Sequence, residues 1–171
     1  MSETASDAMI AKTSGVQVRM ALICVLLTVF GGAMSALYYI PSVATALNDL
    51  GVRMTSMRPI HTAFASMWIF GASVAIAYHW MGSNHGGLTK ADLLRFRIHT
   101  VCWIVAGVGI IVTLLMGIST GREYLGFHPV FSAILLFGWL CFATNLLKRL
   151  KHGFWGQPIY IWFWTVGTLY F

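Results

Sequence analysis

The sequence has few charged residues, and acidic residues are the scarcest among them. Only 9% of its residues are charged and only five are Asp or Glu, whereas soluble domains contain about 25% charged residues. Hydrophobic residues make up 58% of the chain, and a globule of 171 residues cannot hide that much apolar surface from water. The composition therefore excludes a soluble fold and favours a protein whose solvent is lipid.

Cysteine is also scarce, and its placement excludes two further classes of protein. Cys24, Cys102 and Cys141 are odd in number, lie inside apolar runs and have no metal-ligand spacing. They imply no disulfide framework, and we interpret them as small hydrophobic residues.

The net charge of +6 would indicate nucleic-acid binding in a soluble protein. Here we attribute it to membrane topology and expect no nucleic-acid partner.

Apolar runs are what the sequence has in abundance. A transmembrane helix needs about 20 mostly apolar residues to cross roughly 30 Å of hydrocarbon. We predict an all-α integral membrane protein with a polar tail at residues 1–18 and a helical domain at 19–171. Four runs are long enough to span the membrane, and a fifth, shorter run predicts a helix cut off by the end of the chain. These runs are residues 20–43, 60–81, 98–119, 127–147 and 155–171.

Basic residues are distributed unevenly between the loops, which predicts the orientation of the chain. Lys and Arg are enriched in cytoplasmic loops. Eight basic residues fall on the side of the amino terminus: Lys12, Arg19, Lys90, Arg95, Arg97, Lys148, Arg149 and Lys151. Only Arg53, Arg58 and Arg122 fall on the other side. We therefore expect a multi-pass protein with a cytoplasmic amino terminus, which places Arg58, His61, Glu123 and His128 at the outer face.

His61 is the most informative single residue. It follows Pro59 in R-P-I-H-T at the start of the second predicted span, and proline suits the first turn of a helix. A histidine within the membrane is costly unless it is paired or binds a ligand, and neutral imidazole is an axial ligand of haem iron. Arg58, just outside, suits a haem propionate. The residues alone leave haem ligation open against a simple hydrogen bond to a neighbouring helix.

The third loop, T-G-R-E-Y-L-G-F-H-P, contains Glu123 beside Arg122. A carboxylate there could ligate a hard cation such as Ca²⁺. It could equally form a solvated ion pair that contributes little stability, and the spacing alone favours the ion pair.

Two other functions remain open from the histidines. His61 with His128, and His79 with His99, could hold two haems in a small cytochrome b that relays electrons. His61 and His79 are, however, 18 residues or roughly 27 Å apart, longer than the step of about 14 residues usual between the haem ligands of one helix. The third possibility is a haem-free membrane scaffold whose histidines are hydrogen-bonded to neighbouring helices.

Two motifs bring out a family resemblance. The segment from about residue 31 to residue 147 resembles the amino-terminal part of subunit I of the haem–copper oxidase superfamily. It is most similar to the C-type oxygen reductases and the nitric oxide reductases. The first motif is R-P-I-H-T, containing Arg58 and His61, and the second is G-R-E-Y at residues 121–124. Relatives often carry an acidic residue three positions after the glutamate, where this chain has Gly126.

The resemblance implies a function that belongs to a larger protein. His61 would be one axial ligand of a low-spin haem b, with Arg58 near a propionate and Glu123 helping to hold calcium. Subunit I has about twelve helices, so this chain would be its amino-terminal portion. The other axial ligand, the second haem and the copper or non-haem iron would lie beyond it. The implied reaction is reduction of O₂ to water or of NO to N₂O in a bacterial inner membrane, with electrons from a cytochrome c-type subunit or another donor.

Overall fold

The computed structural model is all-helical throughout its described residues, which are 3–83, 87–122, 124–150 and 155–170. Its helices are α1 (Glu3–Leu37), α2 (Pro41–Asp49), α3 (Met54–Ser83), α4 (Lys90–Leu115), α5 (Pro129–Arg149) and α6 (Ile159–Tyr170). Within the described residues, four helices are long and apolar enough to cross a membrane, namely α1 from Ala8 onward, α3, α4 and α5. The prediction of an all-α membrane protein is thereby confirmed.

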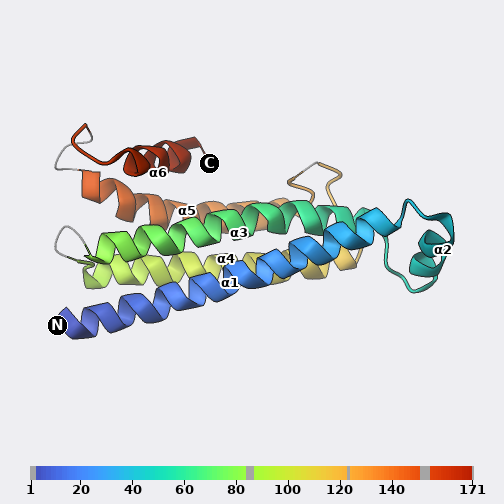
Figure 1. Ribbon diagram of the computed structural model, residues 1–171, viewed down its shortest axis with the longest axis horizontal. Helices are drawn as coiled ribbons and strands as arrows, with labels where there is room; N and C mark the ends of the chain where they lie inside the picture. The colour runs from blue at the N-terminus through green and yellow to red at the C-terminus, as the bar shows by residue number, and fades with distance from the viewer. Residues whose placement is uncertain (1–2, 84–86, 123, 151–154, 171) are drawn as a thin grey trace.

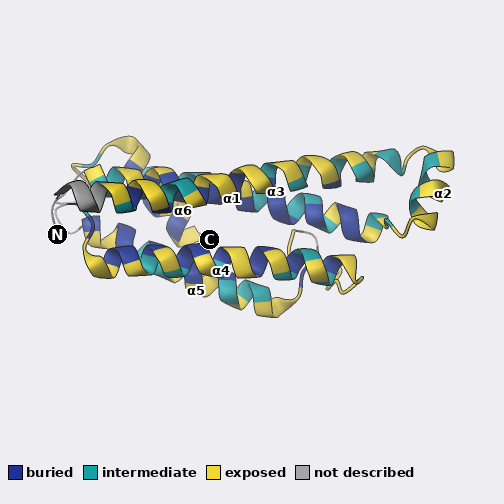
Figure 2. Ribbon diagram, turned by 90° about the horizontal axis from the view of Figure 1, so that it is seen from below, coloured by how far each residue is buried: buried dark blue, intermediate teal, exposed yellow. Residues whose placement is uncertain are grey.

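The four long helices run alternately up and down (Figure 1). The loop before α3 and the loop between α4 and α5 therefore lie at one end of the bundle, and the amino terminus lies at the other. We call these the loop end and the amino-terminal end. Over most of their length the long helices turn buried faces toward one another and exposed faces outward (Figure 2). That exposed surface includes Leu26, Val105 and Leu136, as expected where lipid surrounds the protein.

Helix α1 begins earlier than its apolar run. We predicted a polar tail over 1–18, yet the helix already includes Glu3. Ile10, Thr13 and Gln17 are buried, and their spacing of three and four residues puts them on one helix face. Ile10 packs on α3, since a Cβ added to Gly82 would lie 2.6 Å from its Cδ1 atom.

Three further boundaries differ from the predicted spans. Helix α4 begins at Lys90 rather than near residue 98 because Thr89 and Asp92 form a reciprocal capping box. Pro59, expected in the first turn of its helix, lies inside α3, which begins at Met54. The short helix α2 was not predicted; its nine residues include none that is buried.

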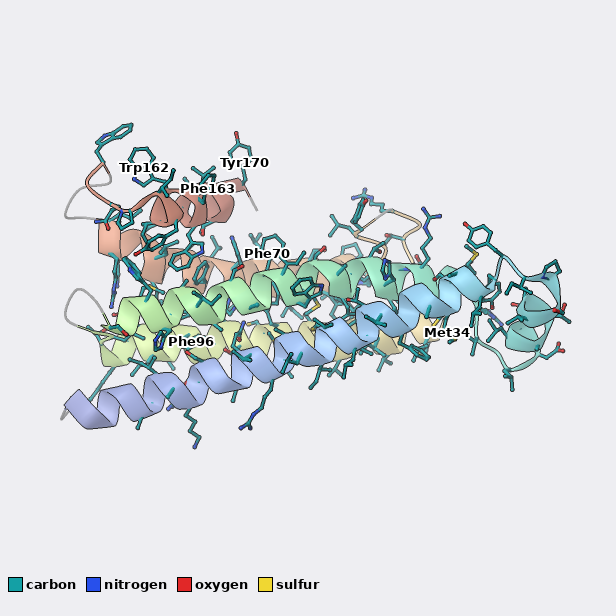
Figure 3. All side chains as sticks on the ribbon, viewed as in Figure 1. Met34, Phe70, Phe96, Trp162, Phe163 and Tyr170 are labelled. Carbon is teal, nitrogen blue, oxygen red and sulfur yellow. The ribbon has the colours of Figure 1, made fainter. Side chains whose placement is uncertain are left out.

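The fifth predicted span, residues 155–171, corresponds to the 12-residue helix α6. Twelve residues cover only about 18 Å, less than the hydrocarbon thickness. The indole Nε1 of Trp139 on α5 donates a hydrogen bond to the Thr168 carbonyl oxygen at 3.0 Å, which ties α6 to the bundle. The remaining face of α6 carries exposed aromatic residues such as Phe163 and Tyr170 (Figure 3).

Candidate functional site

His61 lies on α3 and is half-buried against α1. Its Nδ1 atom is 2.8 Å from the Thr28 carbonyl oxygen. A carbonyl oxygen only accepts hydrogen bonds, so the proton of a neutral imidazole must lie on Nδ1. Within the described residues, Nε2 has no hydrogen-bond partner. The ring is thus held in the tautomer that leaves the Nε2 lone pair available to a metal.

Two consecutive glycines on α1 make this contact possible. A Cβ at Gly32 would lie 2.7 Å from the Nδ1 atom of His61, and one at Gly31 would lie 2.9 Å from the Met57 carbonyl oxygen. Both distances are shorter than real Cβ contacts. The missing side chains therefore let α1 and α3 approach closely enough for the imidazole to reach the Thr28 carbonyl.

A wide pocket of about 650 Å³ lies at the loop end of the bundle, between the start of α3 and the loop that joins α4 and α5. Its lining includes Arg58, Pro59 and Thr62 from α3, and Ser119, Arg122 and Tyr124 from the loop between α4 and α5. His61 does not line it. The pocket nevertheless brings together the two segments, R-P-I-H-T and G-R-E-Y, that are more than 50 residues apart in the sequence. Arg58 and Arg122 both line this pocket, and guanidinium groups are suited to binding carboxylates or phosphates.

The loop between α4 and α5 closes onto α3 through Gly126. Its backbone carbonyl accepts hydrogen bonds from the Thr120 backbone N–H at 2.8 Å and the Ser119 hydroxyl at 3.0 Å. A Cβ at Gly126 would lie 3.2 Å from the Arg122 carbonyl oxygen and 3.3 Å from the Cβ of Pro59. Gly126 is therefore the residue through which this loop packs closely on Pro59. Glu123, the predicted calcium ligand, lies outside the described residues.

His99 has a different environment. It is fully buried, its Nδ1 donates to the Gly138 carbonyl oxygen at 2.9 Å, and its Nε2 lies 3.4 Å from the Gln17 amide nitrogen. With Nδ1 protonated, Nε2 accepts from that amide. Both ring nitrogens are thus used by neighbouring helices, which leaves none for iron. His128 caps α5, accepting from the Val130 N–H at 3.3 Å, and His79 is exposed, so the paired-histidine arrangement of a two-haem cytochrome gains no support.

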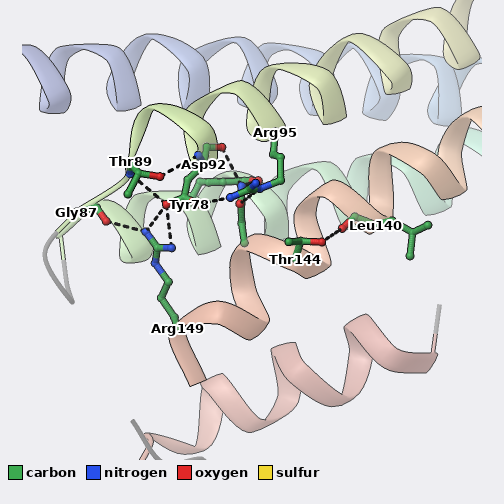
Figure 4. A network of polar contacts seen from close by, with 9 residues as sticks. Tyr78, Gly87, Thr89, Asp92, Arg95, Leu140, Thr144 and Arg149 are labelled. Atoms are coloured by element: carbon green, nitrogen blue, oxygen red, sulfur yellow. Dashed lines mark hydrogen bonds and ion pairs between the residues drawn. The ribbon is translucent and has the colours of Figure 1, made fainter. Parts of the chain in front are cut away.

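The sequence analysis missed a polar network at the amino-terminal end of the bundle (Figure 4). Asp92 and Arg149, only 2% and 9% exposed, form an ion pair at 3.1 Å. Arg95 pairs with the same carboxylate at 2.5 Å and donates to Asn145 at 2.6 Å. Asn145 in turn donates to the Tyr78 hydroxyl at 2.7 Å. Arg149 was predicted to be a loop residue, but it is a buried residue of α5. Its partner, Asp92, could have been found from the sequence, because T-K-A-D at residues 89–92 is typical of a helix capping box.

Among the described residues, no group of three or more His, Cys, Asp or Glu side chains is placed to hold a metal ion. One imidazole nitrogen is therefore the metal-binding group that this region offers, which fits one axial position of a haem and not a complete ligand set.

No protein-family model, curated protein or solved structure matches the chain.

Proposed function

We propose that this chain supplies one axial ligand, His61, to a low-spin haem b in the catalytic subunit of a haem–copper respiratory reductase. The observation that carries the proposal is the contact between the Nδ1 atom of His61 and a backbone carbonyl oxygen, from which the tautomer follows. Its Nδ1–H is bound to the Thr28 carbonyl oxygen, which is the arrangement that orients a histidine ligand and raises its basicity. His99, which is fully buried and joins helices, uses both ring nitrogens for that purpose, whereas His61 uses one.

The pocket at the loop end supports the same function. Arg58 and Arg122 line it, and guanidinium groups bind carboxylates in a bidentate manner, so they would meet the propionates. The haem would supply reversible one-electron transfer. The residues of this chain would hold the ring at one face, neutralise its acidic edge, and keep the imidazole proton on Nδ1.

The remaining parts of the proposal follow from the resemblance. The complete subunit would have about twelve helices and would contain a second haem with copper or non-haem iron. It would lie in a bacterial inner membrane with its amino terminus in the cytoplasm. Electrons from a cytochrome c-type subunit or another donor would reduce O₂ to water or NO to N₂O, and Glu123 would contribute to a calcium site near the propionates.

Haem titration of the purified chain tests the assignment. A single histidine ligand predicts one five-coordinate, high-spin haem per chain, which added imidazole converts to the six-coordinate low-spin form. His61→Ala should abolish this binding, whereas His128→Ala, at the same end of the bundle, should preserve it. Binding that survives His61→Ala would overturn the proposal. Two low-spin haems without imidazole would instead indicate an electron-relay cytochrome, and no haem binding at all would indicate a scaffold.

A further inference from the structure

A second cavity lies on the lipid-facing side of the bundle. It is a groove of about 350 Å³ between α1 and α4, and its walls are residues 16–27 of α1 and residues 103–111 of α4. Phe64 and Met67 of α3 form its floor, and Gly107 adds depth because it has no side chain. Apart from Arg19, its lining consists of apolar side chains, a glycine and Cys24. Its lining differs from that of the pocket at the loop end, which contains two arginines and several hydroxyl side chains.

The dimensions of the groove match one leaflet of a bilayer. Its α1 wall runs from Val16 to Leu27, which corresponds to roughly 16 Å of helix. This is about half of the ~30 Å hydrocarbon thickness. The apolar span of α1 ends at Leu37, and Arg19 lies 18 residues or about 27 Å before that end, close to one hydrocarbon thickness. The groove therefore extends from one interface to the middle of the membrane.

Basic side chains gather at the interfacial end of the groove. Arg19 lines it, and Lys12 is exposed on the same α1 stripe, seven residues or two turns earlier. On α4, Arg97 is exposed on the stripe that continues into Ile104 and Val108.

The two helices are aligned so that Arg97 of α4 lies between the levels of the two α1 cations. The Thr100 hydroxyl donates to the Gln17 side-chain oxygen at 3.0 Å, which places Arg97 at a height between Lys12 and Arg19. The acidic residue nearest along α4, Asp92, is engaged with Arg95 and Arg149. The interfacial end of the groove therefore carries three positive charges.

We propose that this groove is a binding site for an anionic phospholipid. One acyl chain would lie along the apolar groove, and the phosphate would be held by Arg19 with Lys12 and Arg97 around it. A basic end joined to an apolar channel of one-leaflet length fits a lipid with a negative headgroup better than it fits a protein helix. An apolar helix of a partner protein, about 10–12 Å across, would bring no counter-charge to the three cations. This site is independent of haem binding.

Native mass spectrometry of the chain, released from vesicles containing equal amounts of phosphatidylglycerol and phosphatidylcholine, tests the proposal. We expect one retained phosphatidylglycerol per chain. Each basic residue near an anionic lipid contributes about fivefold in affinity. Arg19→Gln should therefore weaken retention about fivefold, and the combined Lys12→Gln, Arg19→Gln and Arg97→Gln variant roughly 100-fold. Circular dichroism would verify that each variant keeps its helicity.

Two matched variants separate a specific site from general attraction. Lys148→Gln removes an exposed charge at the same end of the bundle but on α5, and it should leave retention unchanged. Val108→Trp places a large side chain at the groove and should reduce retention of the lipid without altering any charge. Equal retention of the two lipids, or an unchanged affinity in Arg19→Gln or Val108→Trp, would overturn the proposal. A lipid-independent dimer lost in Val108→Trp would also overturn it, since a second copy would then be the occupant.

Discussion

Removal of the Asp92 carboxylate should destabilise the bundle more than any substitution on its surface. Asp92 is 2% exposed, and its two oxygens accept hydrogen bonds from Arg149, Arg95 and the backbone N–H of Thr89. In Asp92→Ala, Arg149 keeps its 2.7 Å hydrogen bond to the Gly87 carbonyl oxygen but loses its counter-charge. An uncompensated buried charge costs about 3–5 kcal/mol, and loss of the Thr89 N–H hydrogen bond to the carboxylate, one half of the capping box, adds about 1 kcal/mol.

The free energy of unfolding can be measured by titrating the chain in mild detergent with sodium dodecyl sulfate, followed by far-UV circular dichroism. A double variant, Asp92→Ala with Arg149→Met, is the informative control. It removes both charges together, so it should recover most of the loss in Asp92→Ala. A loss below about 1 kcal/mol in Asp92→Ala would refute the reasoning, because that is the range of a solvent-exposed ion pair.

Two further predictions concern glycines around the candidate haem site. In Gly32→Ala the new Cβ would lie 2.7 Å from the His61 Nδ1, so the ring should lose its backbone hydrogen bond and haem should bind roughly tenfold more weakly. Gly15→Ala on the same helix adds a Cβ with nothing within 4 Å and should not change haem affinity. If Gly32→Ala bound haem as tightly as Gly15→Ala, the imidazole would not be positioned by α1. Gly126→Glu should displace the loop from α3 and cost about 1–3 kcal/mol in the same detergent titration. Gly156→Glu, in open space, should be neutral, and a neutral Gly126→Glu would show that the loop is not tightly seated.

The number and class of the spanning helices could be predicted because length and hydropathy determine them directly. Their ends could not, because hydropathy marks the hydrocarbon core and not the hydrogen bonds that terminate a helix. Helix α4 begins where the Thr89 and Asp92 side chains satisfy backbone groups. The early start of α1 depends on Ile10, Thr13 and Gln17, an apolar and polar mixture that becomes a buried face only when α3 and α4 are beside it.

The candidate site was predictable only in part. His61 and Arg58 are identified by residue type and by the R-P-I-H-T motif. The partner of the imidazole is a backbone carbonyl, and a carbonyl is present at every position, so the sequence carries no signal for it. The Asp92–Arg149 pair was missed for a related reason. Arg149 follows a lysine at the end of an apolar run, a pattern typical of solvated loop residues, and only the fold reveals that it is buried.

The two inward-facing histidines give the strongest internal comparison for function. His99 and His61 both lie within long helices and both use Nδ1 to bind a backbone carbonyl oxygen. At His99 a glutamine from α1 occupies the second nitrogen, which satisfies the ring as a buried polar group requires. At His61 two glycines of the same helix lie against the Nδ1 side of the ring and the α3 backbone, and among the described residues no side chain is hydrogen-bonded to Nε2. The fixed tautomer of His61 leaves its Nε2 lone pair available, which is the state that a metal ligand needs at that nitrogen, whereas His99 has no nitrogen left for a metal.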